Sequence, residues 1–162
     1  MLPKRKKIRL DEYDYSKNGC YFITICAKDK GNIFSCIIGN NLDDENNVNI
    51  QLTQIGKIIK DGIEKIPVIY KGIQADIYCI MPDHVHFIIE ILQEDKGETT
   101  LPNISTVIGC FKRYVSKNVG IPIWQKSFYE HIIRNEKDYY EITGYILRNP
   151  KALIFKKYYN NY

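Results

Sequence analysis

The sequence predicts one α+β domain in which helices pack against an antiparallel sheet, and three observations support this fold class. The chain has 162 residues, a length typical of a single domain. Hydrophobic residues make up 44% of it and charged residues 26%, which supports a buried core and excludes disordered or collagen-like chains. Strand-like and helix-like patterns alternate along the chain, and one pair of strands is joined by a link too short for a parallel crossover.

The first predicted strand covers residues 20–27, which are rich in β-branched and aromatic side chains and follow an Asn-Gly pair. Two shorter strands are expected at 33–38 and 48–52, on either side of a polar and acidic loop. These two strands make the segment 28–52 a hairpin-like insertion between the first strand and the first helix.

Thr53 is expected to cap that helix, whose isoleucines recur at intervals of three and four residues and which should end near Pro67. Strands at 75–80 and 84–92 follow, and the Met-Pro-Asp link between them predicts an antiparallel hairpin. An amphipathic helix with a basic outer face is expected at 103–118.

The C-terminal part begins with an aromatic and β-branched stretch, 121–133, which we interpret as a strand. Asn135 can then cap a last helix that Pro150 should end. The order strand, helix, two strands, helix, strand, helix is typical of a ferredoxin-like sandwich, with helices packed mainly on one face of the sheet. Because this fold serves many functions, the function has to be inferred from individual residues.

Charge is segregated along the chain behind a net charge of only +4. Residues 1–9 hold five basic and no acidic side chains, and residues 111–162 hold ten basic and four acidic ones. Residues 40–100 hold five basic and eleven acidic side chains. The two basic ends could form one nucleic-acid-binding face, although a solvated tail and ordinary surface helices would give the same counts.

Five cysteines without a Cys-x-x-Cys pair, most of them among apolar neighbours, predict reduced core thiols and hence a cytoplasmic protein. No stretch reaches the roughly 18 to 20 apolar residues of a membrane span, and no apolar signal segment follows the basic N-terminus. The sequence also lacks a Gly-x-x-x-x-Gly-Lys-Ser/Thr loop, so neither a membrane nor a nucleotide cofactor is expected as a partner.

Two short patterns could carry chemistry. His84 and His86 flank Val85 in a predicted strand, so both imidazoles should point to one face, where they would form half of a metal site. Tyr145 and Asn149 are one helical turn apart and should share a helix face. Each pattern alone has a simpler explanation: two polar residues on the wet face of a strand, and a common residue type in a chain with 13 tyrosines.

Three motifs together resemble the REP-associated tyrosine transposases, a branch of the HUH single-strand nucleases. They are Met-Pro-Asp-His-Val-His at 81–86, Trp-Gln-Lys-Ser-Phe-Tyr-Glu-His-Ile-Ile-Arg-Asn at 124–135 and Tyr-Ile-Leu-Arg-Asn-Pro-Lys-Ala at 145–152. The resemblance runs from about Tyr21 to Ala152, with the motifs in the family's order and approximate spacing.

The resemblance implies a specific chemistry. His84 and His86 match the family's pair of ligands for Mg²⁺ or Mn²⁺, and Asn149 matches the residue that supplies a further ligand. Tyr145 matches the nucleophile, although a phenol with the ordinary pKa of about 10 has to lose its proton as it attacks. The expected products on single-stranded or hairpin DNA are a 5′-phosphotyrosine and a free 3′-hydroxyl, which can be rejoined without ATP.

The resemblance also implies a division of the chain into a basic arm at 1–18, the HUH transposase domain at 19–155 and a tail at 156–162. Glu130 and His131 lie in the central motif and are candidates for active-site support, without an assigned step. A homodimer is compatible with these features. The candidate contacts to DNA phosphates are ten basic side chains: Lys4, Arg5, Lys6, Lys7, Arg9, Lys112, Arg113, Lys117, Arg134 and Arg148.

Other functions are compatible with the same residues. A rolling-circle replication initiator or relaxase shares the histidine pair and the tyrosine but usually carries further domains. A domesticated nucleic-acid-binding module would keep the fold without cleaving DNA, and an interaction protein with relic motifs would bind no divalent ion. The complete set of His84, His86, Tyr145 and Asn149 favours the metal-dependent transposase.

Overall fold

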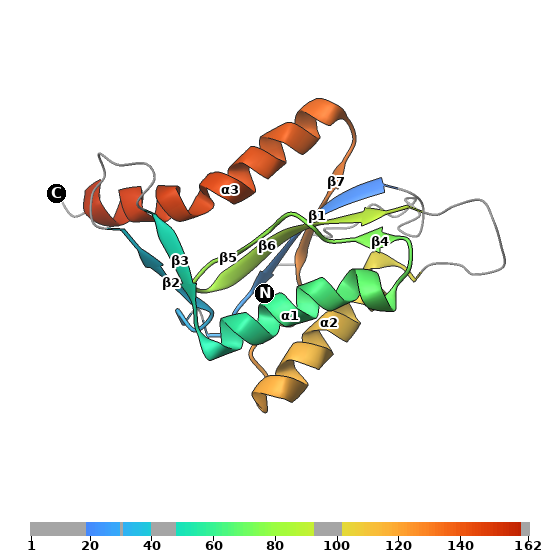
Figure 1. Ribbon diagram of the computed structural model, residues 1–162, viewed down its shortest axis with the longest axis horizontal. Coiled ribbons are helices and arrows are strands. Elements are labelled where there is room, and N and C mark those ends of the chain that lie inside the picture. The colour runs from blue at the N-terminus through green and yellow to red at the C-terminus, as the bar shows by residue number, and fades with distance from the viewer. Residues whose placement is uncertain (1–18, 30, 40–47, 93–101, 160–162) are drawn as a thin grey trace, which may run out of the picture.

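The computed structural model describes residues 19–29, 31–39, 48–92 and 102–159. These residues form a five-stranded antiparallel sheet, a separate two-stranded hairpin and three helices (Figure 1). The strands of the sheet are β1 (Gly19–Cys26), β4 (Ile73–Gln74), β5 (Tyr78–Ile80), β6 (His84–Ile91) and β7 (Tyr129–Ile133). The hairpin consists of β2 (Ser35–Ile38) and β3 (Asn49–Leu52), and the helices are α1 (Gln54–Ile69), α2 (Ile104–Val119) and α3 (Glu136–Tyr159).

The strand order puts β1 and β6 in the middle of the sheet. β1 pairs with β6 on one side and with β7 on the other, and both β4 and β5 pair with the outer side of β6. The strand predicted at 75–80 is therefore shorter than expected, because only Tyr78–Ile80 of it is strand and β4 precedes it. The predicted antiparallel hairpin is confirmed, with Ile80 opposite Val85.

The sheet lies between two helical layers. α1 and α2 cover one face, and α3 crosses the other (Figure 1). Alternation along β1 explains this division: Ile23 and Ile25 are buried in the core under α1 and α2, whereas Phe22 joins Ile146 of α3 in a smaller cluster. The predicted α+β class with a C-terminal helix is confirmed. None of the described helices is long and apolar enough to cross a membrane.

Helix α1 begins as predicted and ends slightly later. The backbone N–H of Gly56 donates to Oγ1 of Thr53 over 3.1 Å, which caps the helix. The helix continues past Pro67 to Ile69, because a proline in the last turn removes one backbone hydrogen bond without forcing the chain to turn.

Helix α3 passes through Pro150 and extends to Tyr159, so the helix end predicted at Pro150 is wrong. A proline inside a helix costs about 3 kcal/mol. Burial of Pro150 and Ile154 against the rest of the molecule offsets this cost. The predicted start is confirmed, since the N–H of Asp138 donates to Oδ1 of Asn135 over 2.9 Å.

The strand predicted at 121–133 is confirmed only at its end, as β7. Gly120 closes α2 in a left-handed conformation with φ of 88°. Between these elements Trp124 forms an isolated bridge with Ala27, and Pro122 has no N–H to donate to a ladder. The expected basic arm at 1–18 lies outside the described residues.

Gly56→Ala should lower the free energy of unfolding by about 2 kcal/mol, within the range of overpacked substitutions. A Cβ at Gly56 would lie 2.0 Å from the carbonyl oxygen of Phe34. This oxygen accepts the backbone N–H of Thr53 over 3.1 Å, so neither it nor α1 can move away freely.

Urea denaturation measures this loss. The matched control is Gly109→Ala in α2, where the new Cβ would meet only a side-chain nitrogen of Arg113 at 3.9 Å. Alanine there should stabilise the protein by up to about 1 kcal/mol. Equal destabilisation by the two substitutions would contradict the argument from close packing.

Candidate active site

The two histidines of β6 share the sheet face that α3 crosses. Val85 between them is fully buried under the opposite layer, and the ring centroids of His84 and His86 are 4.5 Å apart. Alternation along the strand therefore brings the two imidazoles side by side, as the sequence predicts.

His86 is buried and neutral, with one ring nitrogen directed by a neighbouring strand. Its Nδ1 lies 2.8 Å from Oγ1 of Thr24 on β1, and its ring stacks on Phe22 with centroids 5.3 Å apart. Burial, helped by the nearby His84, lowers the pKa of His86 to about 4. Nε2 is buried and has no hydrogen-bond partner among the described atoms. When Nδ1 carries the proton and donates it to Thr24, Nε2 presents its lone pair to the site.

His84 is oriented by the residue before it. Its Nδ1 lies 2.6 Å from Oδ1 of Asp83. A carboxylate in this position accepts a hydrogen bond from the N–H of Nδ1, which fixes the tautomer and leaves Nε2 as the electron-pair donor. Both histidines thus have a hydrogen-bond partner on Nδ1 and a lone pair available on Nε2.

Helix α3 brings Tyr145 to the histidines. The ring centroid of Tyr145 is 5.3 Å from that of His86 and 6.1 Å from that of Phe22. The adjacent Ile146 is fully buried in the cluster with Phe22, which fixes the helix on the sheet, while Tyr145 remains 51% exposed. A phenol beside a buried imidazole can therefore still be reached by a large substrate.

Asn149 lies one turn beyond Tyr145 and is half-buried. Because α3 is unbroken at Pro150, Asn149 keeps helical geometry and shares the helix side of Tyr145. Its amide oxygen is the electron-pair donor that could act with the two imidazoles as a metal ligand.

The donor set fits a divalent ion with open positions. Within the described ranges, no group of three or more His, Cys, Asp or Glu side chains could hold a metal ion. A third ligand from these ranges would be of another type, and an amide oxygen is acceptable to Mg²⁺ and Mn²⁺. Among the candidate ligand atoms, the unpartnered Nε2 of His86 is the one that best fits a metal ligand. Imidazole nitrogens favour transition-metal ions, so the set suits Mn²⁺ better than Mg²⁺.

The two candidates for active-site support do not join the histidines. Glu130 is opposite Ile23 in the β1–β7 pairing, so its buried side chain lies on the face covered by α1 and α2. His131 is on the α3 face, but its Nε2 lies 3.1 Å from Oδ2 of Asp138 at the start of α3. Both residues therefore contribute to the structure around β7 rather than to the space between His86 and Tyr145.

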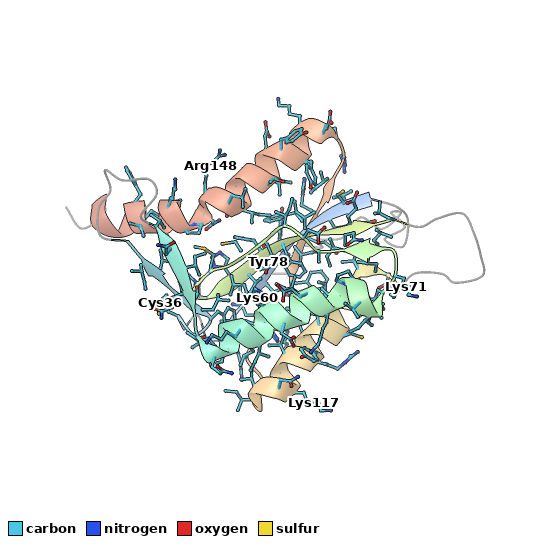
Figure 2. The ribbon with its side chains drawn as sticks, viewed as in Figure 1. Cys36, Lys60, Lys71, Tyr78, Lys117 and Arg148 are labelled. Atoms are coloured by element: carbon cyan, nitrogen blue, oxygen red, sulfur yellow. The ribbon has the colours of Figure 1, made fainter. Side chains whose placement is uncertain are left out.

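The basic residues of α2 lie on the far side of the sheet from the histidines. Figure 2 shows Lys117 on α2 and Arg148 on α3 on opposite sides of the molecule. Lys112 donates to the backbone oxygens of Gln125 and Lys126, at 2.6 and 3.3 Å, and so ties α2 to the loop before β7.

Nη2 of Arg113 lies 3.1 Å from Sγ of Cys110. Of the predicted phosphate contacts, Arg134 and Arg148 are exposed at the start and in the middle of the α3 region. The basic residues of the segment 4–9 lie outside the described part of the chain.

Thr24 and Phe22 are site residues that the sequence analysis missed. Thr24 is opposite His86 in the β1–β6 pairing and opposite Tyr129 in the β1–β7 pairing. A signal existed, because Thr24 is the one hydroxyl side chain between Tyr21 and Cys26 in an otherwise apolar strand.

Thr24→Val should weaken Mn²⁺ binding by about 10- to 100-fold, the usual effect of removing the partner that orients a metal-binding imidazole. Valine keeps the shape and strand preference of threonine but cannot accept from Nδ1 of His86. Titration of Mn²⁺ into the purified protein, followed by calorimetry, measures the change. Unchanged affinity would mean that Thr24 does not orient His86 toward an ion.

Acidification should destabilise the metal-free protein through His86. The unfolded imidazole has a pKa of about 6.5, and the folded one has a pKa of about 4. Between these pH values the unfolded state binds more protons than the folded state. The free energy of unfolding should therefore fall by about 3 kcal/mol in total as the pH falls from about 6.5 to about 4. Denaturation in EDTA at several pH values measures this slope, which His86→Leu should reduce.

Comparison with known proteins identifies related sequences and a related structure. No protein-family model matches the chain. An uncharacterized protein of Haemophilus influenzae is 38% identical over 166 residues, which cover 90% of this chain and 88% of the relative. A second Haemophilus influenzae protein, named "Putative REP-associated tyrosine transposase", is 26% identical over 148 residues, covering 85% of this chain and 73% of the relative.

The solved structure of a REP-associated tyrosine transposase bound to a REP hairpin is similar to this fold. The TM-score is 0.60 at 25% sequence identity, and the match covers 88% of this chain and 74% of that chain. The similarity therefore extends over most of the fold.

Proposed function

We propose that this chain is a REP-associated tyrosine transposase, like the relatives to which it is similar, and that it cleaves and rejoins single-stranded or hairpin DNA through a covalent bond to Tyr145. The position of Tyr145 is the observation that carries this proposal. Its half-exposed ring is 5.3 Å from the ring of His86, and Nε2 of His86 is buried without a hydrogen-bond partner among the described atoms.

The proposed cleavage is an in-line substitution at phosphorus. The phenolic oxygen of Tyr145 loses its proton to solvent or a base and forms a bond to phosphorus, while the bond from phosphorus to the 3′-oxygen breaks. The departing 3′-oxygen takes up a proton and becomes a hydroxyl. The other DNA end is then held as a 5′-phosphotyrosine.

Rejoining reverses these steps with a second DNA end. The new 3′-hydroxyl attacks the phosphotyrosine, the phenolic oxygen of Tyr145 leaves and regains a proton, and a phosphodiester is restored. One ester bond replaces another in each step, so no nucleotide cofactor is required.

His84, His86 and Asn149 are the residues that would hold Mg²⁺ or Mn²⁺. Such an ion, when bound, would neutralise charge on the scissile phosphate and orient it for attack. Asp83 and Thr24 hold the two imidazoles in place from behind. Arg134 and Arg148, together with the basic residues of the segment 4–9, are the proposed contacts to other phosphates.

Hairpin DNA is the proposed substrate because the related solved structure holds a REP hairpin. The test incubates the protein with labelled hairpin oligonucleotides from the regions flanking its gene, in Mn²⁺ or in EDTA. A protein–DNA band that survives denaturation, and that EDTA abolishes, is the expected result. DNA binding without any such band over a broad set of hairpins would instead identify a non-catalytic binding module.

A further inference from the structure

An open apolar cavity of about 300 Å³ lies at the edge of the sheet beside α3. Its lining combines four elements: Leu52 of β3, Tyr78 and Ile80 of β5, Leu147 of α3 and Lys60 of α1. The β2–β3 hairpin closes one side and is fastened to the sheet there, because Oγ of Ser35 donates to the carbonyl oxygen of Ile80 over 2.8 Å.

The cavity is next to the site described above. Cys79 lines it and is opposite His86 in the β5–β6 pairing. On α3, Ile146 and Leu147 directly follow Tyr145, and Pro150 directly follows Asn149. The cavity and the site thus share α3 and the pairing of β5 with β6, and a DNA strand joined to Tyr145 that follows this edge of the sheet would bring a neighbouring nucleotide to the cavity.

Lys60 is the one charged residue among those that line the cavity. Its Nζ lies 2.6 Å from Oε1 of Glu64, and the hydroxyl of Tyr78 donates to the same oxygen over 3.3 Å. Figure 2 shows Lys60 and Tyr78 next to each other. The Lys60 and Glu64 side chains are 45% and 52% exposed, and exposed ion pairs of this kind contribute little stability. The ammonium can therefore exchange Glu64 for a phosphate at small cost.

We infer that this cavity takes one unpaired nucleobase of the DNA strand that Tyr145 cleaves, with Tyr78 against the base and Lys60 on an adjoining phosphate. The inference rests on the proposed function. The volume is at the lower end of the roughly 300–1,000 Å³ of small-molecule sites, enough for one base and its sugar but not for a stacked base pair. An apolar wall with one aromatic ring and one cation matches a nucleotide, since bases stack on aromatic side chains and phosphates bind cations.

The test measures binding of labelled single-stranded oligonucleotides in EDTA, which leaves them uncleaved. Each nucleotide near the cleavage position is replaced in turn by an abasic one. One abasic position should weaken binding about tenfold, as expected for the loss of one stacked base. Leu147→Trp, at a side chain that is 65% exposed, should fill the cavity, weaken binding of the intact strand to the same extent and remove the sensitivity to that abasic position.

Charge variants provide a test with opposite signs. Lys60→Gln should weaken binding severalfold, whereas Glu64→Gln should strengthen it, because it frees Lys60 from its competitor. The matched control is Lys57→Gln, an exposed lysine on the same helix that does not line the cavity. If Lys57→Gln and Lys60→Gln lose equal affinity for the oligonucleotide, the effect comes from net charge alone and the inference is overturned.

Two further outcomes separate this inference from the proposed function. If wild-type protein forms the covalent adduct but Leu147→Trp binds every oligonucleotide as the wild type does, the inference fails and the proposed function stands. If no adduct forms and no oligonucleotide binds, the proposed function itself fails. A change of oligomeric state in Leu147→Trp, measured by sedimentation, would identify the cavity as a contact between two copies and overturn the inference.

Discussion

Tyr145→Phe should abolish the covalent protein–DNA adduct and leave DNA affinity within about twofold of the wild type, since phenylalanine lacks only the oxygen that attacks phosphorus. The ring itself contributes to the structure through its contacts with Phe22 and His86. Phenylalanine preserves these contacts, so the fold and the DNA-binding surface should be unchanged. The adduct is measured after denaturation on a gel, and affinity by fluorescence anisotropy in EDTA.

Tyr129 is the sharpest control, because it is a second exposed tyrosine whose ring lies near Phe22. Its ring is 6.3 Å from the ring of Phe22, and it is 49% exposed. Tyr129→Phe should form the adduct at the wild-type level. The reverse pattern, in which the adduct persists in Tyr145→Phe and disappears in Tyr129→Phe, would identify Tyr129 of β7 as the nucleophile instead of Tyr145.

Local periodicity was sufficient to predict the parts of the site that lie within one element. His84 and His86 share a face because side chains alternate along a strand, and the structure confirms this with rings 4.5 Å apart. The helical turn between Tyr145 and Asn149 was predicted in the same way. Proline at 150 normally biases the preceding residue, Asn149, away from helical geometry. Packing overrides that bias, since α3 continues to Tyr159.

Features that depend on strand pairing or on layer assignment could not be read from the sequence. Thr24 contacts His86 across 62 positions of the chain, and only the register of β1 against β6 reveals this. The same limit applies to Glu130, whose neighbours in the chain suggest a site but whose register with Ile23 turns it to the opposite face. Amphipathicity identified the basic side of α2 but not the sheet face that α2 covers, so Lys112 was predicted as a DNA contact although it holds the loop before β7.

His86→Leu should reduce metal-dependent cleavage by at least about 100-fold, because loss of one ligand removes several kcal/mol of charge stabilisation at the phosphate and about 1.4 kcal/mol corresponds to each factor of ten. Leucine fills the buried position and cannot bind an ion. The fold should survive, since His86 is only 4% exposed and neutral, and the side-chain hydrogen bond lost is the one between Nδ1 and Thr24. That lost bond should cost about 1 kcal/mol, partly offset by the added apolar burial.

The experiment compares three readouts in one variant: cleavage of a hairpin oligonucleotide, Mn²⁺ binding by calorimetry, and thermal unfolding. His131→Leu is the matched control, because it removes the histidine of β7 that contacts Asp138 rather than the site. His86→Leu should lose cleavage and Mn²⁺ binding together while unfolding cooperatively, and His131→Leu should retain both activities. Full cleavage by folded His86→Leu would show that this imidazole holds no ion, and the buried Nε2 would then be a feature of packing alone. Loss of cleavage with Mn²⁺ affinity intact would instead assign His86 to the substrate, because the ion would have to be held by other residues.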